Sequence, residues 1–174
     1  DLGDNEPLMT EAGGRRAAEY ASEFEAAQQE FIRLVESLTD EQWRKVGKNF
    51  PQRISDEDEG RRLGVIAHHV ATSGPVIIDR IQRMLDGRPM PQVDFRSSNA
   101  KHAEEHADVT KEDVLAELRK TQPEIAAAVR AIPDTELDQP RETPAGPMSA
   151  SMRLERVLIG HLKMHQGSIE TAIS

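Results

Sequence analysis

Four long segments of this chain repeat apolar residues at steps of three and four, the spacing that gathers them on one face of an α-helix. The segments span about residues 15–38, 61–86, 110–132 and 149–173. No alternating strand pattern runs for more than a few residues. Four amphipathic helices joined by loops predict an all-α protein built as a four-helix bundle.

Shorter signals fall between and inside these segments. Thr39 opens the run Thr-Asp-Glu-Gln, a capping-box pattern that predicts a short helix carrying Trp43. Residues 99–106 are expected to form another short helix. Pro75 and Pro123 lie inside the second and third long segments, where proline removes a backbone hydrogen bond. We therefore expect each proline to kink its helix or to split it in two.

The chain has 174 residues, the usual size of one domain with a substantial core. We expect residues 1–12 to form a flexible tail and residues 13–174 to form a single domain. The stretch 47–60 combines Gly, Pro and acids, which is typical of a solvated loop. Its acidic run Asp-Glu-Asp-Glu at 56–59 is interpreted as part of that loop rather than as a cation site.

Composition narrows the range of partners and chemistry. The formal net charge is −9, which argues against nucleic acid or an anionic membrane surface as the main partner. No apolar run approaches the roughly 20 residues that span a bilayer, and no signal-peptide pattern opens the chain. A cytoplasmic location is therefore expected. Cysteine is absent, so any metal must be held by His, Asp, Glu or water, and any thiol must come from a cofactor or substrate.

Two histidines lie on the apolar face of the last segment. His161 and His165 are four residues apart, so they share one side of a helix with Leu158 and Ile169. Burying an imidazole costs free energy unless its nitrogens find partners. Two explanations fit the pair: the imidazoles share a metal ion, or they form a buried hydrogen-bond network. The spacing alone does not separate these explanations.

A third inward histidine comes from the second segment. His69 flanks the apolar stripe of that helix, whereas His68 lies nearly opposite and is interpreted as a solvated surface residue. His69 together with His161 and His165 would make a three-histidine cluster. Such a ligand set suits zinc, nickel or another late first-row metal, with a coordination position left for water or substrate.

His102 and His106 are also four residues apart, but their neighbours are mostly charged. We interpret them as solvated helix surface, with the rim of a pocket and a general acid or base as the functional alternative. Other catalytic patterns are missing. His161 is followed by Leu162 rather than Glu, so the His-Glu-x-x-His pattern of zinc peptidases is absent, as is the Gly-x-Ser-x-Gly elbow.

Three stretches together resemble a known family. Residues 63–71 (Leu-Gly-Val-Ile-Ala-His-His-Val-Ala) are similar to the second-helix motif of the DinB/YfiT-like superfamily, with His69 at the position of the first metal ligand. Residues 156–169 (Arg-Val-Leu-Ile-Gly-His-Leu-Lys-Met-His-Gln-Gly-Ser-Ile) resemble its closing motif. Residues 99–106 (Asn-Ala-Lys-His-Ala-Glu-Glu-His) look like a middle segment of many members. The resemblance covers about residues 15–173.

This resemblance implies a four-helix bundle, often homodimeric, in which His69, His161 and His165 bind a divalent metal, most simply zinc or nickel. Members with assigned activity include S-transferases and isomerases that use the low-molecular-weight thiols bacillithiol, mycothiol or glutathione, and proposed hydrolases. The middle segment makes Asn99 and His102 candidates for substrate binding. The expected function is a metal-dependent enzyme acting on a small molecule, through thiol transfer, isomerisation or hydrolysis. The alternative is a non-catalytic small-molecule-binding or stress-response protein.

One departure affects the closing motif. Many members carry two adjacent histidines at its second position, whereas here Met164 precedes His165. The expected metal ligand His165 is present, but the second histidine next to it is missing. This departure does not exclude a metal site, but it weakens the assignment of any particular family activity to this chain.

Overall fold

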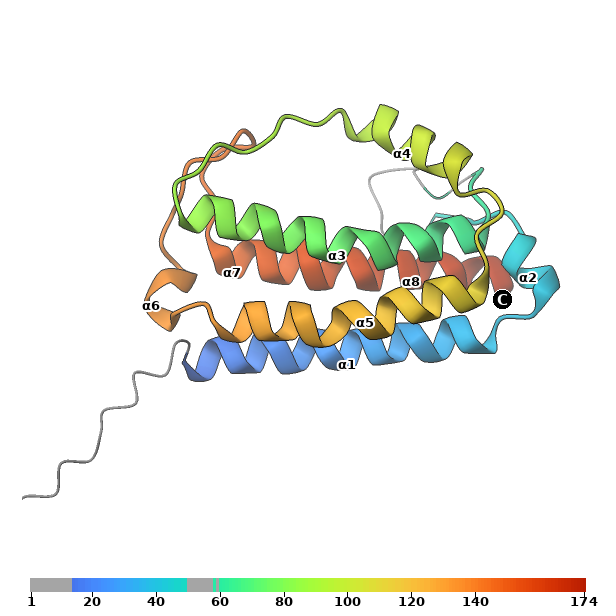
Figure 1. The fold of residues 1–174 in the computed structure, drawn as a ribbon, viewed down its shortest axis with the longest axis horizontal. Helices are drawn as coiled ribbons and strands as arrows, with labels where there is room; N and C mark the ends of the chain where they lie inside the picture. Colours follow the sequence, from blue (N-terminus) through green and yellow to red (C-terminus); the bar gives the residue numbers. More distant parts are fainter. Residues whose placement is uncertain (1–13, 50–57, 59) are drawn as a thin grey trace, which may run out of the picture.

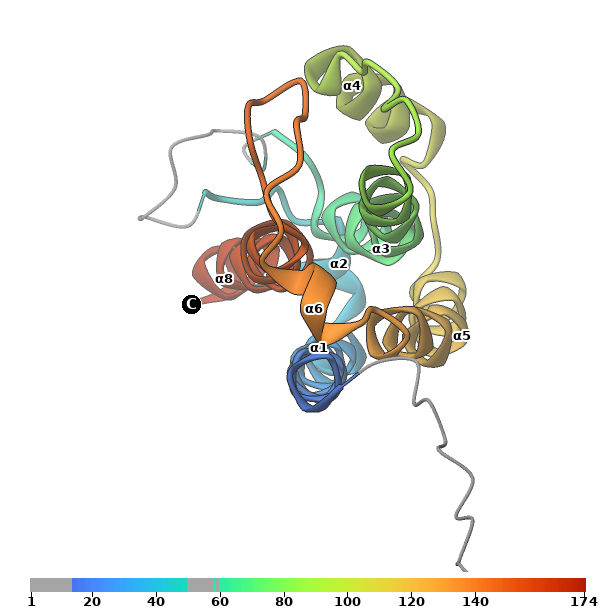
Figure 2. The ribbon, with the colours of Figure 1, turned by 90° about the vertical axis from the view of Figure 1, so that its left-hand side faces the viewer.

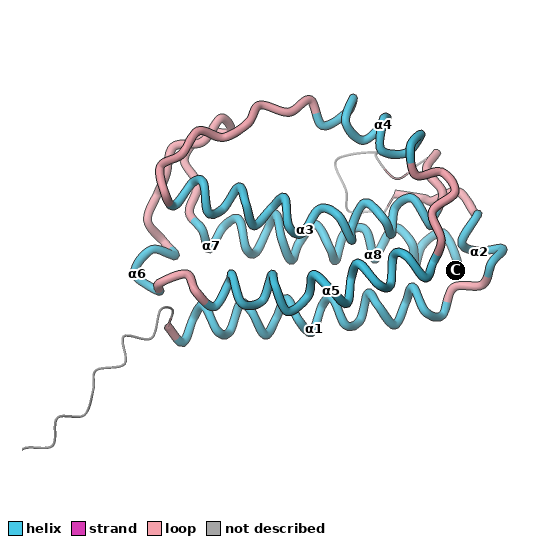
Figure 3. The backbone as a smooth tube through the Cα atoms, in the orientation of Figure 1, coloured by secondary structure: helices cyan, strands magenta, loops and turns pink. Residues whose placement is uncertain are grey.

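The computed structural model describes residues 14–49, 58 and 60–174, and these residues form a helical bundle without a β-sheet (Figures 1 and 3). Its long helices are α1 (Arg15–Ser37), α3 (Leu63–Leu85), α5 (Lys111–Arg130) and a C-terminal rod. The rod joins α7 (Ala150–Met152), η1 (Arg153–Ile159) and α8 (Gly160–Ile173). The prediction of an all-α four-helix bundle is therefore confirmed. Residues 1–12, the expected tail, lie outside the described residues.

The four long rods lie around a common bundle axis, as the view along the bundle shows (Figure 2). α1 and the C-terminal rod run in one direction, and α3 and α5 run in the other (Figure 1). Because α3 and α5 are parallel, the chain must return along the bundle between them. It does so through residues 86–110, which carry α4 (Phe95–Glu105) across the outer side of α3 (Figures 1 and 2).

Short helices close the two ends of the bundle. α2 (Asp40–Arg44) starts with the expected capping box: Thr39 Oγ1 accepts from the Gln42 N–H at 3.1 Å, and Gln42 Oε1 accepts from the Thr39 N–H at 2.9 Å. Trp43 Nε1 donates to the Val109 carbonyl at 3.0 Å, which ties α2 to the residues before α5. At the other end lies α6 (Asp134–Leu137). No helix in the described parts of the chain is long and apolar enough to cross a membrane.

Neither proline divides its helix. α3 continues through Pro75 and α5 continues through Pro123, so the alternative of two shorter helices is wrong in both cases. Packing on both sides of each proline compensates for the one backbone hydrogen bond that is lost. α4 begins at Phe95, four residues before the expected short helix, because the Asp94 carboxylate caps it by accepting from the Ser97 N–H.

Apolar side chains fill the bundle in two clusters that meet near its middle. Along α3, Val70 belongs to one cluster and Ile77 to the other; along the C-terminal rod, Leu162 and Leu158 are divided in the same way. The largest fully buried members are Phe24, Ile81, Leu137 and Leu154 in the first cluster, and Phe31, Leu38, Leu63, Ile66, Leu118 and Ile169 in the second. In the sequence, His161 lies between Ile159 of the first cluster and Leu162 of the second, whereas His69 and His165 lie among residues of the second cluster.

The C-terminal rod contains a π-helical stretch, η1, directly before the first histidine of α8. The Gly160 N–H bonds to the Glu155 carbonyl, five residues earlier, which is the π-helical pattern. A Cβ placed on Gly160 would lie 2.9 Å from that carbonyl oxygen, closer than side chains tolerate. The glycine therefore permits the wide turn that sets the orientation of the residues before His161.

Candidate metal centre

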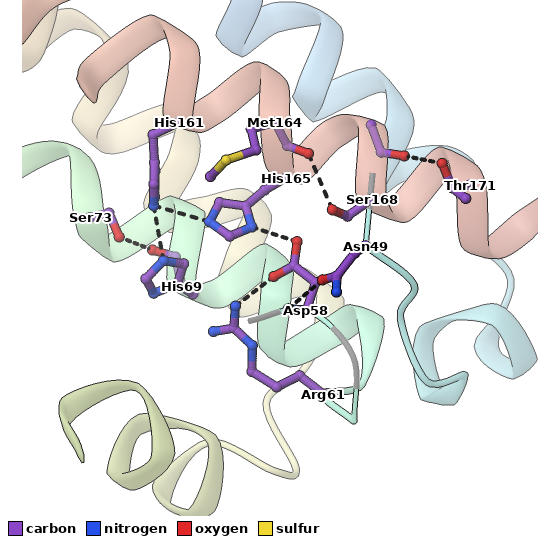
Figure 4. A network of polar contacts seen from close by, with 11 residues as sticks. Asn49, Asp58, Arg61, His69, Ser73, His161, Met164, His165, Ser168 and Thr171 are labelled. Carbon is purple, nitrogen blue, oxygen red and sulfur yellow. Dashed lines mark hydrogen bonds and ion pairs between the residues drawn. The ribbon is translucent and has the colours of Figure 1, made fainter. Parts of the chain in front are cut away.

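Three imidazoles converge where α3 faces α8 (Figure 4). His161 Nε2 lies 3.1 Å from His69 Nε2 and 3.0 Å from His165 Nε2. One nitrogen from each ring lies within 4.8 Å of the others. His165 is completely buried, and the other two rings are partly buried. The structure therefore brings together the three histidines that the sequence predicted as one cluster.

A buried carboxylate fixes the orientation of His165. Asp58 Oδ2 accepts from His165 Nδ1 at 2.8 Å, with both side chains inaccessible to solvent (Figure 4). Because a carboxylate only accepts, Nδ1 carries the proton, and in the neutral ring Nε2 then presents its lone pair toward His161. A carboxylate that holds a histidine in this tautomer is the usual second partner of a metal-bound imidazole.

Asp58 itself is held ionised by its surroundings. Burial opposes ionisation, but the hydrogen bond and charge of His165, a hydrogen bond from Ser168 and the charge of Arg61 outweigh it and lower the pKa of Asp58. Arg61 Nη2 donates to Asp58 Oδ1 at 2.5 Å. The interpretation of the acidic run at 56–59 as solvated loop is therefore wrong for Asp58, the one residue of that run described here.

Hydrogen bonds among the three rings cannot give each of the facing Nε2 atoms a suitable partner. His161 Nε2 faces two other Nε2 atoms, and a single ring nitrogen is either a donor or an acceptor. One proton must therefore be shared between two acceptors, or two N–H groups must point at one lone pair. A metal ion accepts lone pairs from all three nitrogens at once.

The separations between these nitrogens also suit a metal. Two nitrogens bound at about 2.0–2.1 Å to one ion lie roughly 2.8–3.4 Å apart for angles between right-angled and tetrahedral. The observed separations of 3.0 and 3.1 Å from His161 Nε2 lie within that range. Burial, followed by the nearby charges of His165 and His161, lowers the pKa of His69 to about 2. His69 is therefore neutral at physiological pH, which is the form that binds metal.

A pocket of about 460 Å³ adjoins the three-histidine cluster. His69 and His161 line it, as do Asn99 and His102, which were proposed for substrate binding. Their role in binding stays a prediction, but both residues face the space beside the cluster. The candidate ligands thus combine three imidazoles with an open side toward a pocket, which would leave a coordination position free for water or another ligand.

The other three histidines form a second cluster, contrary to our interpretation of them as solvated surface. His68 Nδ1 lies 2.7 Å from His102 Nε2, and the His68 and His106 ring centroids are 4.1 Å apart. All three residues are partly buried because α4 covers this side of α3. The helical wheel correctly separated His68 from His69, but it contained no information about a helix packed outside the bundle.

Two functional residues escaped the sequence analysis. Asp58 looked like its acidic neighbours in the sequence, and only its tertiary contact with His165 sets it apart. Arg153 lines the pocket and is 7% exposed. Its position depends on the π-helical stretch, which periodicity at 3.6 residues per turn does not reveal.

Comparison with known proteins agrees with the fold and the cluster. No curated protein is significantly similar to this chain. The model of the DinB superfamily matches residues 23–169, which include α3, α4, α5 and all six histidines. The match extends over most of the sequence, and the chain belongs to the DinB superfamily.

Proposed function

We propose that this protein is a metal-dependent enzyme in which His69, His161 and His165 hold a divalent ion, zinc or nickel, beside a small-molecule pocket. The observation that carries the proposal is the Asp58–His165 hydrogen bond, 2.8 Å long and fully buried. A merely packed histidine does not need a buried carboxylate, whose desolvation is costly. A metal ligand does, because the carboxylate selects the binding tautomer and raises the basicity of the ring.

A divalent ion at such an open site lowers the pKa of a bound water or thiol and so supplies a nucleophile near neutral pH. The chain contributes orientation and a partly enclosed space. Asp58 positions His165, and the Ser73 hydroxyl donates to the His69 carbonyl at 2.6 Å within α3. Because the chain lacks cysteine, a thiol nucleophile would be an external low-molecular-weight thiol. We therefore propose S-transfer, isomerisation or hydrolysis of a small electrophile bound in the pocket that Asn99 and His102 line.

Elemental analysis of the purified protein tests the metal assignment. We expect His161→Ala to lose one equivalent of metal relative to the parent protein. Lys163→Ala is the matched control, because Lys163 lies on the same helix, pairs with Glu23 and is exposed. Equal metal content in the parent protein and His161→Ala would contradict the proposal. So would a melting temperature that chelator leaves unchanged, since a ligand that binds only the native state stabilises it.

Catalysis requires its own test. The zinc- and nickel-loaded proteins should be assayed for thiol conjugation of a chloronitrobenzene and for hydrolysis of a nitrophenyl ester. The proposed chemistry predicts turnover that chelator abolishes and metal restores. Tight metal binding without turnover in a broader panel of thiols and electrophiles would favour the non-catalytic binding protein.

A further inference from the structure

Arg153 is a buried cation without a counterion among the residues that the structure describes. Its side chain is 7% exposed, and no carboxylate in the described ranges lies within ion-pair distance. Its Nε is buried and has no hydrogen-bond partner there. Burial, and then the charge of Arg80, lowers the pKa of Arg153. Fold stability does not explain this placement, because an unpaired buried charge is destabilising.

Arg80 brings a second positive charge to the same pocket. Both arginines line the cavity that His69 and His161 also line. Arg80 is held by the Phe95 ring, 5.3 Å from its guanidinium carbon, and by the Pro91 carbonyl at 3.3 Å, neither of which neutralises it. Two like charges gathered in one partly buried space attract an anion.

The mouth of this pocket is apolar. Val76, Val93 and Phe95 line it and are 55%, 40% and 58% exposed, which makes them three of the four large apolar side chains most accessible to solvent in the described structure. Exposed apolar groups gathered at one cavity usually mark a binding site. The pocket therefore offers an apolar wall, a pair of arginines and an imidazole cluster to one ligand.

We propose that this pocket binds a small amphipathic organic anion, with its carboxylate or other anionic group at Arg153 and Arg80 and its apolar body against Val76, Val93 and Phe95. The binding of the anion does not depend on the proposed function, whereas its identification as the substrate of the enzyme rests on that function. Arg153 precedes His161 by eight residues, about two helical turns, so a ligand anchored there extends toward the metal centre. The anion is then a specificity group, away from the reacting bond.

Titration calorimetry with benzoate as the probe tests the assignment on chelator-treated protein. We expect benzoate to bind at least about tenfold more tightly than its neutral isostere benzamide, since a charged hydrogen bond contributes at least that much. Arg153→Met should weaken benzoate binding by a similar factor. Arg83→Met is the matched control, because Arg83 is on the same helix as Arg80, pairs with Asp79 and does not line the pocket.

We also expect Arg153→Met to change the stability of the protein, and this change distinguishes a loss of benzoate binding from a failure to fold. Replacing an unpaired buried cation by an apolar side chain of similar length should raise the melting temperature of the ligand-free protein by a few degrees. Absence of benzoate binding, equal binding of benzamide, or unchanged binding to Arg153→Met would overturn the proposal. Because no metal is present in the titration, these outcomes are independent of whether the three-histidine centre binds zinc.

A different observation supports a second assignment. His68, His102 and His106 each offer one nitrogen within 4.8 Å of the others, on the side of α3 facing α4. His102 Nδ1 is buried and lacks a hydrogen-bond partner among the described residues. Asp113 and Glu117 of α5 line a hollow together with His68 and His106, so carboxylates are available beside the three imidazoles. Imidazole and carboxylate ligands together suit zinc and related divalent ions.

We infer that His68, His102 and His106 form a second divalent-metal site, which fastens α4 to the bundle. Titration with zinc alone should give two equivalents bound to the parent protein and one to either His106→Ala or His161→Ala. Amide hydrogen exchange in α4 should accelerate on loss of the second site only. One equivalent in the parent protein, or two in a folded His106→Ala variant, would overturn the inference. Circular dichroism establishes that the variant is folded.

Discussion

Asp58→Asn isolates the contribution of the buried carboxylate to the metal centre. The amide has nearly the same size, but its oxygen is a neutral acceptor and its nitrogen is a donor. His165 therefore loses the charge that favours its Nδ1–H tautomer, while the rings of His69 and His161 are untouched. Substitution of such an outer partner typically costs about 10–100-fold in metal affinity.

This loss of affinity translates into a thermal shift. With metal in excess, a 10–100-fold weaker site reduces the metal-dependent stabilisation by about 1.4–2.7 kcal/mol. A chain of this size melts about 2–4 °C lower for each kcal/mol. The rise in melting temperature caused by zinc should thus be smaller by about 3–10 °C in Asp58→Asn. Using the rise caused by zinc, rather than the melting temperature itself, removes the separate cost of depriving Arg61 of its buried partner.

The assay combines thermal melting at fixed zinc with chelator competition for the dissociation constant. Both proteins should also carry His106→Ala, so that zinc at the second cluster does not contribute. Asp138→Asn is the control, because Asp138 also accepts from a hydroxyl and pairs with an arginine, but it lies directly after α6 and outside the three-histidine cluster. A dissociation constant that Asp58→Asn leaves within twofold of the parent value would refute the assigned role of the carboxylate.

Three further outcomes follow from the structure. The pKa of His69 is lowered to about 2 in the folded protein, so as the pH falls the histidine is protonated in the unfolded chain before it is protonated in the native state. The metal-free protein should therefore lose about 2 kcal/mol of unfolding free energy between pH 7 and pH 5, measured by urea unfolding. A free energy of unfolding that does not change over this range would contradict the prediction. Gly160→Ala should lower the melting temperature and weaken zinc binding, because the new Cβ meets the Glu155 carbonyl, whereas an ordinary helix would gain about 1 kcal/mol from the same change. Thr39→Ala should cost about 1 kcal/mol without affecting zinc binding, since it removes only the α2 cap; an altered zinc affinity would argue against separate roles.

Periodicity in the sequence is sufficient to predict the bundle and the inward histidines. His161 and His165 lie one turn apart on a face that must be buried, and His69 borders the apolar stripe of α3; both facts depend only on residue spacing. The Thr39 capping box is likewise a local pattern, and the structure reproduces it. Such features succeed because neighbours along one helix determine them.

The remaining parts of the site depend on contacts between distant segments. Asp58 reaches His165 across 107 positions of sequence, and His102 reaches His68 across 34. No local pattern distinguishes Asp58 from the other acids of its run. Arg153 depends on the π-helical stretch, whose hydrogen bonds span one residue more than those of an α-helix and so rotate the side chains relative to an α-helical wheel. Tertiary contacts and a change of helical pitch therefore set the surroundings of a histidine cluster that residue spacing locates.

Buried polar atoms without hydrogen-bond partners are concentrated around this chemistry. In the described parts of the chain they belong to Arg61, His102, Arg141 and Arg153, and three of these four side chains adjoin the histidine clusters or the pocket. Each such group destabilises the fold unless a ligand satisfies it. Their distribution is expected if metal and an anionic ligand complete the site, and is unexpected for a core that only packs. At saturating concentrations, zinc and benzoate together should therefore raise the melting temperature of the parent protein by more than the Arg153→Met substitution raises that of the ligand-free protein. A larger rise from the substitution would indicate that the buried groups do not serve to bind these ligands.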